Sequence, residues 1–203
     1  MRPAARAPLR DALSYARRMA LGMFMAALAG APAHAAPPQA APFAPPHIEQ
    51  QVSQARLAGQ GEFTWFGLRI YEAQLWVGPQ GYQPGAPEAA PFALDLRYAR
   101  ALDGQRIAQA SADQMKKIGA GSEAQRQAWL LTMRATFPDV KEGSHLSGTY
   151  LPGVGVRFHL DGKALAEVPD PQFALAFFAI WLAPASSAPQ LRAALLAGAG
   201  PRP

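Results

Sequence analysis

The residues that most often carry chemistry are few in this chain and stand far apart. Three histidines outside the N-terminal segment, His47, His145 and His159, could act as metal ligands or general bases. None of them has a second histidine or a carboxylate at a ligand spacing such as i and i+4 on a helix, so we expect no metal site. Asp139 and Glu142 could pair as an acid and a base, but solvated loop carboxylates are the commoner outcome of such a spacing.

Motifs for the common covalent and nucleotide chemistries do not occur in the sequence. It contains no G-x-S-x-G elbow, no G-x-x-x-x-G-K-[ST] phosphate loop and no strand-linked G-x-G-x-x-G fingerprint, so we expect no cofactor. The chain has no cysteine, which excludes a disulfide framework, thiolate chemistry and a lipoprotein anchor. Four tryptophans could line an apolar ligand cavity, although core packing is the commoner role for each: Trp65, Trp76, Trp129 and Trp181.

The first 35 residues form a chemically distinct unit. Five arginines precede or open an apolar run at 19–31, and the segment closes on A-H-A at 33–35. This order is typical of a secretory signal peptide, so we expect cleavage after Ala35 and a periplasmic or secreted protein. The apolar run is too short for a membrane anchor, so no membrane span is expected after cleavage. Arg17 and Arg18 leave the export route open between the general secretory and twin-arginine pathways.

Cleavage of this segment would change the charge of the protein. The whole chain has a formal net charge of +5, but residues 36–203 hold 14 basic and 13 acidic residues. Such a balance gives no support for a nucleic-acid partner. Residues 36–46 are rich in proline and alanine and are expected to form a linker. The rest is long enough for one domain with its own core.

The apolar pattern predicts strands, two helices, further strands and two more helices. Aromatic and β-branched residues separated by glycines predict a strand pair over 57–77, and strict alternation predicts a strand over 92–98. Asp103 and Ser122 are expected to cap two successive helices. Three short strands are expected after them, at 146–151, 154–160 and 163–168.

The stretch 170–196 contains the most apolar helix of the domain. Its apolar run at 173–183 is about half of the roughly 20 residues that a spanning helix needs, so we expect a buried core helix. Asp170 and Pro171 suit its first turn, and Pro189 suits the start of a second, amphipathic helix. The order of elements predicts an α+β fold with helices on one face of a mostly antiparallel sheet.

Four blocks of the sequence, in order, resemble the bacterial chalcone isomerase-like proteins: residues 59–77, 92–111, 137–162 and 170–196. The resemblance implies an open-faced β-sandwich, in which helices are layered on a large antiparallel sheet with a ligand cleft between them. It also implies a domain over 47–198, which leaves 199–203 as a flexible tail.

The resemblance allows the catalytic positions of true chalcone isomerases to be compared with the residues of this chain. True chalcone isomerases close a flavanone ring with an arginine, a threonine, a tyrosine and an asparagine. Matched motif to motif, these positions fall on Phe63, Tyr71, Ile107 and Gln114. Phe63 cannot bind a phenolate and Ile107 cannot donate a hydrogen bond, so chalcone cyclisation is not expected.

Some other members of the fold bind fatty acids, with an arginine and a tyrosine on the carboxylate. That pair is incomplete here, but Arg69, Arg100 or Arg106 could supply the cation that a buried carboxylate needs. The candidate ligand-binding residues are Tyr71, Tyr98, Gln114, Arg100 and Arg106. We therefore expect an exported, non-catalytic domain that binds a small apolar or amphipathic, fatty-acid-like ligand. An isomerase or intramolecular lyase acting on a chalcone-like enone, and an envelope protein with a structural or partner-binding role, are the alternatives.

Overall fold

One antiparallel sheet of six strands organises the protein. The computed structural model describes residues 42–202, so the expected signal peptide and residues 36–41 of the expected linker lie outside the described residues. Each strand pairs with its neighbours in sequence, in the order β1 to β6. The strands are β1 (Arg56–Trp65), β2 (Leu68–Val77), β3 (Phe92–Tyr98), β4 (His145–Leu151), β5 (Gly155–Leu160) and β6 (Lys163–Val168).

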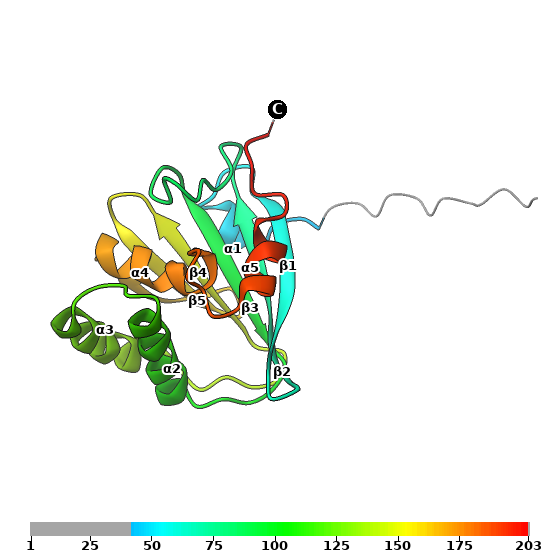
Figure 1. The fold of residues 1–203 in the computed structure, drawn as a ribbon. Helices are drawn as coiled ribbons and strands as arrows, with labels where there is room; N and C mark the ends of the chain where they lie inside the picture. The colour runs from blue at the N-terminus through cyan, green and yellow to red at the C-terminus, as the bar shows by residue number, and fades with distance from the viewer. Residues whose placement is uncertain (1–41, 203) are drawn as a thin grey trace, which may run out of the picture. The chain divides into compact units, whose positions relative to one another are not determined.

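Four helices cover one face of this sheet, as Figure 1 shows. Helices α2 and α3 lie between β3 and β4 in sequence, and α4 and α5 follow β6. This arrangement confirms the predicted α+β class with an open sheet. A short helix, α1, was not predicted and lies on the opposite face. The helices are α1 (Pro46–Glu49), α2 (Gly104–Lys117), α3 (Glu123–Thr136), α4 (Pro171–Leu182) and α5 (Pro189–Leu196).

The main core lies between the sheet and helix α4. Alternate residues of β3, including Phe92 and Leu94, point toward the helices. Phe178 of α4 meets Phe92 with ring centroids 4.9 Å apart, and Phe177 meets Phe158 at 5.3 Å. Helix α4 packs against β4 and β5 of the sheet and also against α2 and α5. Since it is covered on several sides, α4 is apolar on nearly all sides. None of the helices found between residues 42 and 202 has the length and apolar character needed to cross a membrane.

Asp170 fixes the start of α4 and also joins α4 to α3. Its Oδ1 accepts hydrogen bonds from the backbone N–H groups of Gln172 and Phe173, each at 2.9 Å, as predicted for a capping residue. Its Oδ2 accepts a third from the indole Nε1–H of Trp129 in α3, also at 2.9 Å. The predicted caps Asp103 and Ser122 are confirmed, the latter as a complete capping box.

The last residues are packed against the domain. Ala199 is buried, and its carbonyl oxygen accepts a hydrogen bond of 2.7 Å from the backbone N–H of Tyr82. Arg202 donates its backbone N–H to the carbonyl of Pro79 at 2.9 Å. Ala199 and Arg202 are thus held against the domain by backbone hydrogen bonds, where a flexible tail at 199–203 was expected. The partners lie more than a hundred residues away in sequence, so no local pattern could reveal them.

Polar side chains gather on the opposite face of the sheet, beneath α1. The strand register places Asp95, Ser147 and His159 side by side across β3, β4 and β5. His47 of α1 shares a hydrogen bond with Ser147, with Nε2 and Oγ 2.7 Å apart, and its ring lies 4.8 Å from that of His159. His145 binds Asp95 through Nδ1 at 2.7 Å. Residues 42–202 contain no group of three histidine or acidic side chains arranged for a metal ion.

We expect His47 and His159 to make the folded protein less stable in acid. Burial lowers the pKa of His47 and of His159, and the nearby charges of His47 and Arg157 lower that of His159 further, while Asp95 partly opposes the shift of His47. The folded state then binds fewer protons than the unfolded chain. The contribution of the two neutral histidines to the free energy of unfolding is therefore complete above about pH 6.5 and is lost as the pH falls below it. His145 behaves in the opposite sense, because its hydrogen bond with Asp95 raises its pKa.

Thermal unfolding measured from pH 7.5 to pH 5 tests this expectation. The melting temperature of the wild type should fall with pH, and the paired substitution His47→Gln and His159→Gln should flatten that fall. His145→Gln is the control, since its loss should leave the acid-side decline in place or steepen it. A paired variant that declines as steeply as the wild type would contradict the assignment.

Candidate functional site

A cavity of about 440 Å³ lies between the sheet and the helices. Its volume is within the range of roughly 300–1,000 Å³ that is typical of ligand sites. Strands β1 to β4 form one wall, and α2 and α4 form the other. Residues of the adjoining loops complete the lining. The lining residues are Phe63, Trp65, Ile70, Tyr71, Leu96, Tyr98, Leu102, Arg106, Ile107, Ala110, Ser111, Asp113, Gln114, Lys117, Phe137, Leu146, Phe177, Ile180, Trp181, Ser187 and Ala188.

Three aromatic residues on adjacent strands make the sheet wall. Strand pairing places Phe63 of β1 opposite Tyr71 of β2, and Tyr71 opposite Tyr98 of β3. The rings of Phe63 and Tyr71 stack with centroids 5.1 Å apart, and those of Tyr71 and Tyr98 meet edge to face at 5.9 Å. Since one strand face repeats every second residue, the register alone brings these side chains together.

Trp181 of α4 completes the inner end of the cavity. Its indole Nε1–H donates a hydrogen bond of 3.0 Å to the hydroxyl oxygen of Tyr71. Burial raises the pKa of Tyr71 and that of Tyr98 well above the usual value, so both phenols keep their protons at any physiological pH. Within residues 42–202 neither hydroxyl donates to a protein acceptor. Both can therefore donate a hydrogen bond to a ligand.

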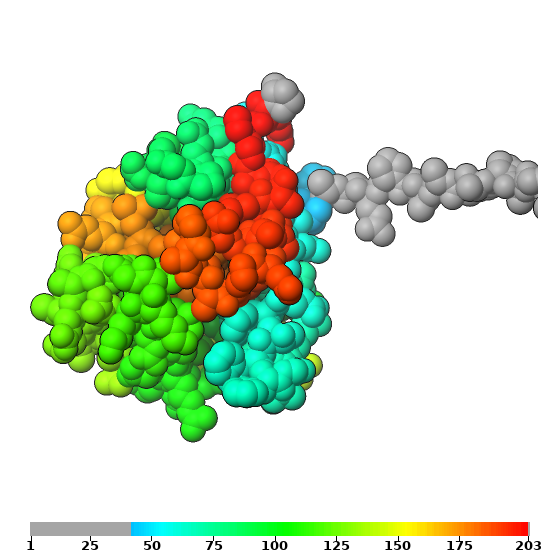
Figure 2. All heavy atoms as spheres, viewed as in Figure 1, coloured from blue at the N-terminus to red at the C-terminus, as the bar shows by residue number. Residues whose placement is uncertain are grey.

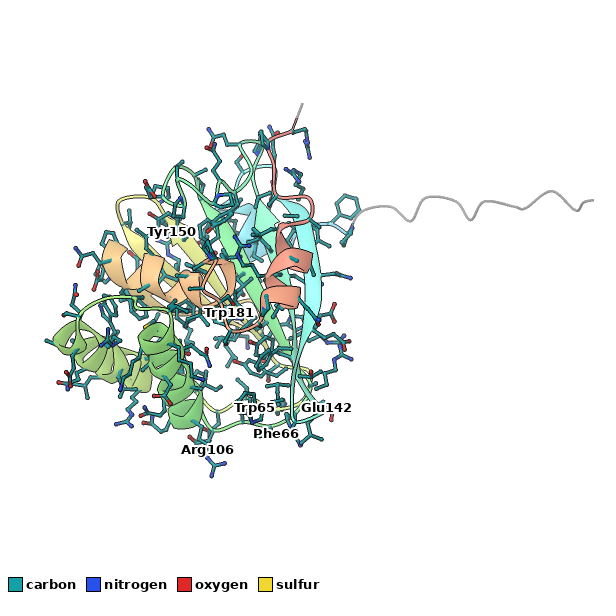
Figure 3. The ribbon with its side chains drawn as sticks, in the orientation of Figure 1. Trp65, Phe66, Arg106, Glu142, Tyr150 and Trp181 are labelled. Carbon is teal, nitrogen blue, oxygen red and sulfur yellow. The ribbon has the colours of Figure 1, made fainter. Side chains whose placement is uncertain are left out.

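The outer end of the cavity is polar and is formed mainly by one face of α2. Gln114 accepts a hydrogen bond of 2.6 Å from the hydroxyl of Ser187, which precedes α5. Arg106 and Lys117 are exposed on the same face of α2, and neither makes an ion pair or a side-chain hydrogen bond with any residue in 42–202. Figure 3 shows Arg106 in the first turn of α2, on the same side of the molecule as Trp65, with Trp181 farther inside. The cavity thus has an aromatic inner end and a cationic rim.

The structure brings most of the predicted site residues together. The four family positions, Phe63, Tyr71, Ile107 and Gln114, all line the cavity, and so does the candidate Tyr98. Phe63 and Ile107, which the sequence matching puts at the arginine and tyrosine positions of true chalcone isomerases, therefore both line the cavity.

Of the three candidate cations, only Arg106 lines the cavity. Arg69 instead pairs with Glu62 across the hairpin at 3.1 Å and with Glu72 at 3.3 Å. Arg100 is not a lining residue; it follows the end of β3 at Tyr98. Neither Arg69 nor Arg100 therefore lines this cavity, and a role for either in ligand binding stays a prediction.

Sequence reasoning missed Lys117 and Ser187 as rim residues. Lys117 stands eleven positions after Arg106, three turns along one helix face, so the helical period could have indicated it. Ser187 is brought in by the packing of α4 and α5, for which the sequence has no signal. Of the four tryptophans, Trp65 and Trp181 line the cavity, and Trp76 and Trp129 pack elsewhere.

The fold and the cavity together define a class of protein: an open antiparallel sheet that encloses an apolar ligand space beneath a layer of helices. A family model described as chalcone isomerase-like matches residues 43–197, and the chain belongs to this family.

The chain is also similar to two individual proteins. An uncharacterised protein of Haemophilus influenzae is 30% identical over 138 residues, which is 68% of this chain, and the chain spans 66% of that relative's length, just under two thirds. The crystal structure of a fatty-acid binding protein of Arabidopsis thaliana has a similar fold, with a TM-score of 0.55 and 12% identity, over 72% of this chain and 89% of that one.

Proposed function

We propose that this domain is non-catalytic and binds a fatty-acid-like amphipathic molecule. The observation that carries the proposal is the polarity gradient of the cavity, from the aromatic inner end at Phe63, Tyr71 and Trp181 to the unpaired cations Arg106 and Lys117 at the rim. The similar fold of a protein named for fatty-acid binding supports it. The acyl chain would lie inside and the acidic head group at the rim.

The energetics of burial favour this orientation. Each buried CH₂ group of an acyl chain contributes about 0.8 kcal/mol of favourable transfer from water. A carboxylate placed against Tyr71 and Tyr98 would find hydrogen-bond donors but no cation, and desolvation of an unpaired charge is costly. At the rim the same carboxylate stays partly hydrated and meets Arg106 and Lys117. Asp113 is also at the rim, but its Oδ1 accepts a hydrogen bond from Gln109 at 3.1 Å.

The isomerase alternative is tested beside the binding proposal. Tyr71 and Tyr98 could donate hydrogen bonds to a ketone oxygen, but Phe63 and Ile107 leave no group to bind and place a phenolate. Incubation with chalcone and related enones, with Tyr71→Phe for comparison, should give no turnover above the uncatalysed rate.

Export stays a prediction from residues 1–35. The alternative of an envelope protein that binds a protein partner would be favoured by co-purified protein together with an empty cavity.

Binding of fatty acids can be measured by calorimetric titration of the full chain with saturated acids of 12 to 18 carbons. Replacing both rim cations, Arg106→Glu with Lys117→Glu, should weaken binding of the acid by about tenfold to a hundredfold, since hydrogen bonds to charged groups contribute about 1.5–3 kcal/mol. Binding of the methyl ester should change little.

Lys116→Glu is the matched control for these variants. Lys116 is exposed on α2 next to Lys117 but does not line the cavity, so this change alters the charge of the helix without altering the rim. It should leave the affinity for fatty acids within about twofold of the wild type. No saturable binding of any acid, or equal losses for acid and ester in the rim variant, would contradict the proposal.

A further inference from the structure

Three of the six large exposed apolar side chains of residues 42–202 lie together at one place, the turn between β1 and β2. Trp65, Phe66 and Leu68 lie in four consecutive residues and are 54%, 89% and 53% exposed. We call this segment, residues 65–68, the hairpin tip. Figure 3 shows Trp65 and Phe66 at the end of the hairpin, away from the helix layer around Trp181. Scattered exposed hydrophobic residues are ordinary in proteins, but a contiguous group of them marks an interaction surface.

The backbone of the tip makes this group more unusual. Phe66 has φ of +47°, in the left-handed region that disfavours every residue with a bulky side chain, and Gly67 follows with φ of +75°. A tight hairpin turn of this kind is best served by Asn-Gly or Asp-Gly. Phe66 therefore has an unfavourable conformation as well as an exposed ring. Its one aromatic neighbour in 42–202 is Trp65, with ring centroids 5.1 Å apart. Packing within the domain therefore does little to offset the unfavourable backbone conformation of Phe66.

The surroundings of the tip point to the nature of its partner. Trp65 also lines the cavity, so the tip stands beside the opening of the ligand space. Arg106 is also a lining residue and lies on the same side of the molecule as Trp65, as Figure 3 shows. Arg100 is close as well, because the backbone N–H of Ala99 bonds the carbonyl of Ile70 at 2.9 Å, just above the tip. Among residues 42–202, neither Arg100 nor Arg106 has an ion-pair partner. Figure 2 shows the face on which α2, the β1–β2 hairpin and α5 meet.

We propose that the hairpin tip inserts into the interface of an anionic lipid bilayer. Tryptophan and phenylalanine are the side chains that settle at the boundary between head groups and acyl chains, and nearby cations attract anionic lipid. The cavity opening then faces the bilayer, where amphipathic ligands reside. A second copy of the chain is a poorer partner, since three side chains cannot bury the ~800 Å² per partner typical of stable protein interfaces. The proposal concerns docking and holds whatever ligand the cavity takes.

The fluorescence of Trp65 offers a direct readout of docking. The chain has four tryptophans, and Trp76, Trp129 and Trp181 are 2%, 5% and 7% exposed. Residues 1–41 contain none, so a shift in emission on adding vesicles that persists in Trp181→Phe reports the tip and not lipid inside the cavity. The full chain is mixed with vesicles of phosphatidylcholine alone and with vesicles that also contain phosphatidylglycerol. We expect a blue shift and quenching by brominated acyl chains, with about tenfold tighter binding to the anionic vesicles.

Phe66→Asn separates docking from folding. Asparagine is favoured at positive φ, so this variant should be at least as stable as the wild type. It should lose about tenfold or more of the vesicle affinity that the Trp65 emission reports, while its affinity for dissolved fatty acid stays unchanged. Leu131→Asn is the matched control, because Leu131 is 67% exposed on α3 and should have no effect on docking.

Two results would overturn the proposal. One is Trp65 emission that does not change with either kind of vesicle at low salt. The other is a blue shift that appears without vesicles and grows with protein concentration, which would identify a second copy as the partner. Both readouts omit the fatty acid, so a failure of docking leaves the binding proposal standing, and an empty cavity leaves docking standing.

Discussion

Replacement of Gly59 by alanine is expected to lower the free energy of unfolding by about 3 kcal/mol, the upper range for overpacking a close contact. An added Cβ would lie 2.0 Å from the carbonyl oxygen of Ala194 and 2.6 Å from that of Leu195. Both atoms belong to the backbone of α5, so no side-chain rotation can relieve the overlap. Either β1 or α5 must move.

Helix α5 is held in a way that opposes such movement. Just beyond its end, the backbone N–H of Gly198 donates to the carbonyl of Ala58 at 2.9 Å, one residue before Gly59. Within the helix, Arg192 donates Nε–H to the carbonyl of Leu182 at 2.8 Å, which ties α5 to the end of α4. A shift of α5 would strain both connections. The absence of a side chain at Gly59 is therefore what allows α5 to dock on the sheet.

Gly61→Ala is the matched control for this prediction. It lies two residues along the same strand, and its added Cβ would meet Cδ1 of Leu191 at 2.9 Å and Cβ of Ala194 at 3.1 Å. Since the nearest of these is the end of a side chain that can move, a loss of about 1 kcal/mol is expected. Urea unfolding of both variants measures the difference. Equal losses would show that α5 yields at Gly59 as readily as a side chain does.

The substitution Trp181→Ala should have an equally large effect, on stability and on ligand choice. Trp181 is buried between α4 and the sheet, and aromatic-to-alanine changes in a core typically cost about 3–5 kcal/mol. The change also removes the inner end of the cavity and the hydrogen bond to Tyr71. If the cavity binds an acyl chain, the variant should prefer longer chains than the wild type.

Trp181→Phe isolates the hydrogen bond from the volume. It keeps an aromatic ring but loses the indole N–H, so the free energy of unfolding is expected to fall by about 1 kcal/mol.

Saturating long-chain fatty acid should raise the melting temperature of Trp181→Ala more than that of the wild type, because the ligand fills the new space and binds only the folded state. Identical chain-length preferences in the two proteins would mean that Trp181 does not bound the site.

The helices and strands could be predicted from the sequence because the signals for them are local. Alternation marked β3, the capping residues Asp103, Ser122 and Asp170 marked three helix starts, and the length of the apolar run marked α4 as a core helix. Helix α1 was not predicted, because four residues are too short to show a period. The resemblance to a family also singled out Phe63 and Ile107, and both line the cavity.

The sequence by itself thus determined the six strands, the four longer helices and their order, while the absence of the family's catalytic side chains stays a prediction. Only the tertiary structure decided that Arg106 reaches the cavity while Arg69 pairs with Glu62, that His47 stacks on His159, and that Gly59 gives α5 its place on the sheet. Secondary structure depends on neighbours within a few residues. Contacts at the site depend on how helices dock on the sheet across a hundred or more residues, and spacing along the chain carries no record of that docking.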